Sequence, residues 1–173
     1  ALLGNYHLPF FNIVLSLIFI AISAVITVDI LCVKGSFLSI FIGAIFAVYP
    51  VVTSTFAYNF SAVFYFMALM LALLSVRQSL NNKYISGVIL LTLSLGFYQA
   101  YFSVALTVSL TVVMVMLLDK DIKLIDSIKK GVSFIASFIV SLLLYLVINK
   151  LSVIIMKPPA TGYQGADEMG TLA

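Results

Sequence analysis

The chain has 173 residues, of which 64% are hydrophobic and only 9% are charged, and its formal net charge is +3. Soluble proteins carry roughly 25% charged residues, so this composition excludes an ordinary soluble domain and indicates an integral membrane protein. The basic residues lie mostly at the ends of apolar runs, where they act as topology signals. The net charge therefore gives no reason to expect a nucleic-acid partner.

The apolar runs are continuous, most clearly over residues 10–33 and 131–148. A transmembrane strand instead alternates apolar and polar residues over about ten positions. The sequence therefore predicts an all-α fold, a polytopic transmembrane helical bundle that forms one domain over residues 1–173. The single cysteine, Cys32, provides neither a disulfide framework nor a cysteine metal site. Because the chain begins with Ala1 and ends in a polar tail, we expect it to be a piece of a longer protein.

Charges, prolines and polar clusters divide the chain into about six membrane segments, to be compared with the roughly 20 residues that a span needs. The predicted segments cover residues 10–33, 35–49, 58–76, 84–97, 100–118 and 131–148, the last with a continuation toward residue 156. Pro50 is predicted to end or kink the second segment. The second and fourth segments are short, so each is either a tilted full span or a re-entrant hairpin, and we favour full spans.

Six crossings are favoured because they collect seven of the nine basic residues on one side of the membrane. These seven are Lys34, Arg77, Lys83, Lys120, Lys123, Lys129 and Lys130. The positive-inside rule assigns this side to the cytoplasm. The extracytoplasmic face then carries residues 1–9, 51–59 and 97–101 and a loop over residues 157–173.

Two features near the predicted cytoplasmic side have structural explanations. Asp29 is the only carboxylate well inside an apolar run, but Lys34 could approach it or its side chain could reach the lipid headgroups. Residues 119–130 place isoleucines at i, i+3 and i+6 between lysines, which is typical of a short helix on an anionic leaflet. A solvated linker is the alternative interpretation of that segment.

The connection at 97–101 holds Tyr98, Gln99 and Tyr101 between two apolar runs. Polar groups are costly in hydrocarbon unless they lie at an interface, in a bundle interior or at a cavity. Aromatic residues also anchor membrane proteins at the lipid–water interface, which is the structural alternative. An amide between two phenols matches sugar-binding surfaces, where rings stack on the sugar and amides bond its hydroxyls. We therefore interpret these three as candidate substrate-binding residues.

Other hydrogen-bonding residues on the predicted extracytoplasmic face complete the candidate substrate-binding set. They are Tyr58, Asn59, Tyr163 and Gln164. Asn59 also begins a glycosylation pattern and is equally well explained as a helix N-cap, while an ordinary connecting loop is the alternative for the tail. Asp167 and Glu168 are the candidates for a catalytic base or a metal contact. No metal-ligand cluster, catalytic triad or phosphate loop is present, so no metal site is predicted and the sequence defines no cofactor.

One stretch resembles a known family. Ser94-Leu95-Gly96-Phe97-Tyr98-Gln99-Ala100-Tyr101, followed by an apolar span, is similar to the most recognisable part of the bacterial and phage type II glucosyltransferases that modify O-antigen. Pro50, then Phe56-Ala57-Tyr58, then a span rich in Met, Ala and Leu up to Arg77 fit the same pattern. The likeness covers most of residues 8–150.

The resemblance implies a polytopic GT-C-like glycosyltransferase of the bacterial inner membrane. Such an enzyme takes a sugar, typically glucose, from a polyprenyl-phosphate carrier and transfers it to a lipid-linked polysaccharide, such as the O-antigen of lipopolysaccharide, on the outer face. The resemblance also implies a carboxylate base that deprotonates the acceptor hydroxyl. Relatives usually carry acidic residues in an external loop after an earlier first helix, and this sequence does not contain that region. We therefore expect the catalytic base outside it.

Two other classes of membrane protein stay open. One is a transporter or flippase of lipid-linked sugars, in which helices broken at Pro50 and Gly96 line a path. No inverted repeat and no charge at mid-membrane supports it in the sequence. The other is a non-catalytic membrane subunit that packs on a partner. Membrane lipids are expected partners in every case.

Overall fold

The computed structural model describes residues 9–156, and almost all of this part is helical. The elements are α1 (Pro9–Ile30), α2 (Ser36–Val48), α3 (Pro50–Thr55), the 3₁₀-helix η1 (Phe56–Tyr58), α4 (Asn59–Leu80), α5 (Tyr84–Phe97), α6 (Tyr101–Leu118) and α7 (Leu124–Met156). Residues 9–156 contain no β-strand, so the predicted all-α fold is confirmed. Of these helices, α1, α4, α6 and α7 are long and apolar enough to cross a membrane.

Pro50 separates α2 from α3, as the sequence predicted. Tyr49 is extended, with φ −60° and ψ 128°, and Pro50 begins the next helix. A proline disfavours helical backbone at the preceding residue and is well suited to the first helical position, which explains the break. With 13 residues, α2 is about 20 Å long, and α5 with 14 residues is about 21 Å long. Both are shorter than the roughly 30 Å hydrocarbon core of a bilayer.

The last helix differs from the sequence-based expectation. Instead of a separate short helix within 119–130, residues from Leu124 onward belong to the continuous 33-residue α7. The segment contains no proline, and exposed charges such as Lys129 do not end a helix. Residues 119–123 form the connection to α6, and the position of this segment on a lipid surface stays a prediction.

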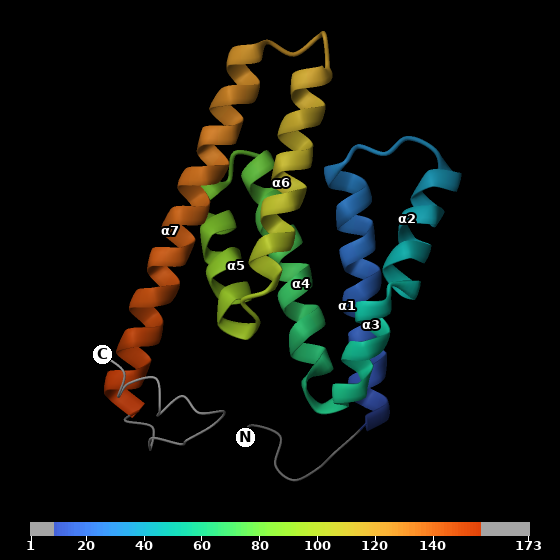
Figure 1. Cartoon of the computed structure of the whole chain (residues 1–173), viewed down its shortest axis with the longest axis vertical. Helices are drawn as coiled ribbons and strands as arrows, with labels where there is room; N and C mark the ends of the chain where they lie inside the picture. The colour runs from blue at the N-terminus through green and yellow to red at the C-terminus, as the bar shows by residue number, and fades with distance from the viewer. Residues whose placement is uncertain (1–8, 157–173) are drawn as a thin grey trace, which may run out of the picture.

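Apart from the short α3 and η1, successive helices run in alternating directions (Figure 1). The connections 31–35, 81–83 and 119–123 therefore lie toward one end of the bundle. The turns around α3 and η1 and the connection 98–100 lie toward the other end (Figure 1). The three connections that carry lysines are thus on the same side of the bundle, as the predicted alternation requires.

Helix α4 is the centre of the bundle and packs against α1, α5 and α6. Its alanines Ala62, Ala68 and Ala72 are fully buried. On α5, Gly87 faces Ser79 so closely that a Cβ added to the glycine would lie 2.4 Å from the serine Oγ. Such small residues let helix backbones approach each other, which is the main source of packing energy between helices in lipid.

Side-chain hydrogen bonds between helices fix α5 between α4 and α7. Ser94 Oγ donates to the Ala68 carbonyl at 2.7 Å, and Ser141 Oγ donates to the Val88 carbonyl at 3.3 Å. At the end with the lysines, Lys130 Nζ donates to the last carbonyls of α4 at 2.8 Å. Because α5 is held on both sides, the connection that follows it has a defined position.

Asp29 pairs with a different residue from the one proposed on sequence. Its carboxylate lies 2.6 Å from Arg77 Nε, and both side chains are about half exposed. Lys34 follows the end of α1, beyond the left-handed turn at Cys32, whereas α4 packs directly alongside α1. The ion pair therefore joins two helices, and an exposed pair of this kind contributes at most about 1 kcal/mol.

Candidate functional site

The connection between α5 and α6 is a short bend at residues 98–100. Tyr98 is extended, with φ −158° and ψ 110°, and its N–H donates to the Ser94 carbonyl at 2.9 Å to close α5. The Phe102 N–H donates to the Gln99 carbonyl at 3.1 Å, which starts the next helix. The side chains of Tyr98 and Gln99 are both exposed. Backbone hydrogen bonds therefore fix the conformation of the bend, and the bend exposes polar side chains.

Three tyrosines meet at this bend. The ring of Tyr98 lies 4.5 Å from that of Tyr65, measured between centroids, and 5.3 Å from that of Tyr101 in an edge-to-face arrangement. Tyr65 comes from α4 and was not singled out in the sequence, although a phenol inside an apolar run usually has a polar partner. The position of this phenol inside an apolar run was the sequence signal that could have identified Tyr65. The cluster joins α4 to the bend and to the start of α6.

The tyrosine cluster lines a cavity of about 430 Å³. We call it the tyrosine cavity, and its lining includes Tyr49, Tyr65, Tyr98 and Tyr101. The rest of the wall is mainly apolar and comes from α2, α3, α4 and α6. No described residue that lines it is charged. The cavity can therefore accept a ligand that combines apolar groups with hydroxyl or phosphate oxygens.

Gln99 lies on another side of the bend. Its Nε2 donates to Tyr145 Oη of α7 at 2.5 Å. The two residues line a second cavity of about 400 Å³, here called the amide recess, together with residues 95–98 and Ala100. The sequence treated Tyr98, Gln99 and Tyr101 as one group, whereas the structure divides them between two cavities and places Tyr98 in both.

The remaining candidates lie elsewhere. Tyr58 is 61% exposed in η1 and lines neither cavity. It is also the N-cap of α4, so the prediction of an N-cap at Asn59 is wrong by one residue. The tail candidates lie outside the described residues: Tyr163, Gln164, Asp167 and Glu168.

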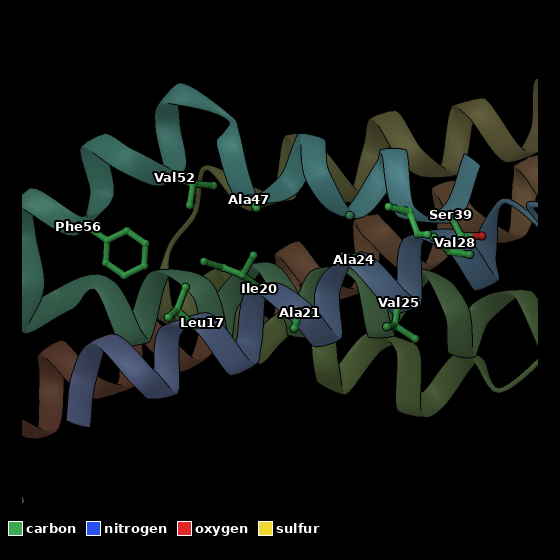
Figure 2. Close-up of a pocket in the computed structure, with 12 residues that line it drawn as sticks. Leu17, Ile20, Ala21, Ala24, Val25, Val28, Ser39, Ala47, Val52 and Phe56 are labelled. Atoms are coloured by element: carbon green, nitrogen blue, oxygen red, sulfur yellow. The ribbon is translucent and has the colours of Figure 1, made fainter. Parts of the chain in front are cut away.

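A third cavity of about 520 Å³ runs between α1 and α2 (Figure 2). Apart from Ser39, its lining is apolar, with Leu17, Ile20 and Phe56 among the larger side chains. Val52 lines both this cavity and the tyrosine cavity. An apolar cavity without titratable groups cannot supply acid–base chemistry.

The linings of the tyrosine cavity and the amide recess offer phenol and amide groups. Neither the tyrosine cavity nor the amide recess is lined by an acidic side chain within residues 9–156. In the same part of the chain no group of three or more His, Cys, Asp or Glu residues could hold a metal ion. Phenols and an amide can stack on sugar rings and exchange hydrogen bonds with hydroxyls or phosphate oxygens.

The fold and the candidate site together define an all-α membrane protein with a polar, aromatic bend that borders two cavities. The whole chain, residues 1–173, matches the family described as Glucosyl transferase GtrII, and the chain belongs to that family. The glucosyltransferase resemblance seen in the sequence is thereby confirmed. Comparison with curated proteins and with solved structures gives no match.

Proposed function

We propose that the protein is a GT-C-like membrane glucosyltransferase of the bacterial inner membrane. It transfers glucose from a polyprenyl-phosphate carrier to a lipid-linked polysaccharide, such as the O-antigen of lipopolysaccharide, on the extracytoplasmic face. The proposal depends on one observation above all. The bend with its tyrosine cavity and amide recess lies away from the end that carries the lysine-bearing connections (Figure 1).

The distribution of charge supports this orientation. Lys34, Lys83, Lys120 and Lys123 all lie in or next to connections at one end of the bundle. The positive-inside rule assigns that end to the cytoplasm, which directs the bend toward the other side of the membrane.

The length of α5 supports a recessed site. A helix of 14 residues covers about 21 Å of the roughly 30 Å hydrocarbon core. With Lys83 at the cytoplasmic surface, the bend would lie about 9 Å short of the opposite surface. Helices α4 and α7 extend past the bend on either side (Figure 1). Irregular polar backbone at such depth is tolerated only inside protein or beside a water-filled cavity, and a lipid-linked substrate could reach it from the bilayer.

The proposed transfer requires that the donor and the acceptor be held in position and that one group accept a proton. The acceptor hydroxyl oxygen attacks the anomeric carbon of glucose, the carrier phosphate leaves with the electrons of its glycosidic bond, and a carboxylate takes the hydroxyl proton. The phenols of Tyr98 and Tyr101 would hold the sugar phosphate, and Asp167 and Glu168 stay the candidates for the base within this sequence. The family assignment favours this enzyme over the transporter alternative.

Glucosyl transfer by the full-length enzyme tests the proposal. Tyr98→Phe removes a hydroxyl shared by both cavities, and Gln99→Ala removes the amide. We expect each variant to transfer glucose more slowly or to bind the acceptor more weakly. Unchanged turnover and acceptor affinity in both variants would remove the bend from the mechanism.

A further inference from the structure

We infer that the bend separates two binding sites, and that Gln99 and Tyr145 form a subsite for the acceptor polysaccharide. The tyrosine cavity then receives the lipid-linked donor. This inference rests on the proposed function and adds Tyr145, from α7, to the residues that contact substrate.

The placement of the two cavities is the first argument. The Gln99 to Tyr145 hydrogen bond joins the bend to α7, whereas Tyr65 joins it to α4. Figure 1 shows α7 and α4 on opposite sides of α5 and its bend. Tyr98 lines both cavities, so two ligands bound on either side would meet at its ring.

The chemistry of the two linings is the second argument. Apolar side chains such as Phe46 and Leu69 surround the phenols of the tyrosine cavity, which suits a ligand with hydrocarbon next to its polar group. The residues from Gly96 to Ala100 in the amide recess are exposed and include an amide and two aromatic rings. That lining suits a ligand rich in hydroxyls, such as the sugar units of the proposed acceptor polysaccharide.

The hydrogen bond itself prepares the amide recess for a sugar. One Nε2 hydrogen of Gln99 is used by Tyr145, which leaves the other hydrogen and the carbonyl oxygen for a ligand. Because Tyr145 Oη accepts that bond, its own O–H is available to donate. The pair therefore offers two donors and one acceptor in fixed positions, which lowers the entropy cost of binding a hydroxyl-bearing ligand.

Steady-state kinetics of the full-length enzyme can separate the two sites. We would vary polyprenyl-phosphate glucose and the lipid-linked polysaccharide separately, and compare Tyr145→Phe with the matched control Tyr65→Phe. Each variant loses one phenolic oxygen. We expect Tyr145→Phe to raise KM for the acceptor roughly three- to tenfold and to leave KM for the donor unchanged. Tyr65→Phe should raise KM for the donor and leave KM for the acceptor unchanged.

Direct binding distinguishes failure of this inference from failure of the proposed function. Absence of glucosyl transfer by the wild-type enzyme would refute the proposed function only. Titration of delipidated polysaccharide then still tests the subsite, since Tyr145→Phe should weaken its binding while Tyr65→Phe should not. A higher donor KM, an unchanged acceptor KM, or equal polysaccharide binding in Tyr145→Phe would overturn the inference. A lower melting temperature together with higher KM values for both substrates would assign Tyr145 a purely structural role. That outcome would overturn the inference as well.

Discussion

Replacing Gly87 with alanine tests how closely α4 and α5 approach each other. A Cβ at this position would lie 2.4 Å from Ser79 Oγ and 3.1 Å from the Ser75 carbonyl oxygen. Both serines are buried, at 3% and 2% exposed. The Ser79 hydroxyl can rotate away from the new methyl group. The Ser75 carbonyl belongs to the backbone of α4, so that contact is relieved only if the two helices move apart.

The expected loss of stability follows from two opposing effects. Adding atoms to a well-packed interior typically costs about 1–3 kcal/mol. Alanine is also a better helix former than glycine by up to about 1 kcal/mol. Because rotation of Ser79 relieves one contact, we expect Gly87→Ala to lower the free energy of unfolding by about 1 kcal/mol. Gly87→Val, which adds branched carbon at the same place, should lower it by about 2 kcal/mol.

Gly43→Ala is the matched control, because a Cβ there would meet no atom within 4 Å. It should leave the free energy of unfolding unchanged or raise it by up to about 1 kcal/mol. The measurement is reversible unfolding of the full-length protein in mixed micelles, followed by circular dichroism. Equal stability of Gly87→Ala and wild type, or an equal loss in Gly43→Ala, would refute the close approach of α4 and α5.

Three further predictions concern the helix contacts and the orientation of the bundle. Ser94→Ala removes the hydrogen bond to the Ala68 carbonyl and should destabilise the protein by about 0.5–1.5 kcal/mol in the same unfolding assay. Lys130→Met removes the ammonium group that caps the last carbonyls of α4, and should cost about 1–2 kcal/mol of unfolding free energy. In a cysteine-free background, Gln99→Cys should react with an impermeant thiol reagent from the periplasmic side, and Lys123→Cys only from the cytoplasmic side.

Controls for these predictions come from neighbouring positions. Ser103 is exposed and donates within its own turn, so Ser103→Ala should change stability far less than the substitution at Ser94. Lys129 is exposed beside Lys130, and Lys129→Met should have little effect. If Ser103→Ala lowered the free energy of unfolding as much as Ser94→Ala, the Ser94 contact would be contradicted. An equal loss in Lys129→Met and Lys130→Met would likewise contradict the Lys130 contacts. Labelling of Gln99→Cys and Lys123→Cys from the same compartment would contradict the orientation.

The sequence by itself determined the all-α class and most helix boundaries. Long apolar runs, Pro50 and the charged connections are local signals, and the structure follows them, with α5 occupying the predicted residues 84–97. The alternating direction of the helices was likewise readable, because basic residues mark every second connection. The glucosyltransferase family was readable from the stretch around Gln99, and the whole chain matches that family.

Only the tertiary structure decided which side chains meet. It brought Tyr65 and Tyr145 to the bend, placed Gln99 apart from the tyrosine cavity, and paired Asp29 with Arg77. A helix that is apolar on all sides shows no stripe that marks its inward face, so its rotation and depth cannot be read from periodicity. Those two quantities come from close packing at small residues and from hydrogen bonds between helices. They also determine which polar groups face each cavity.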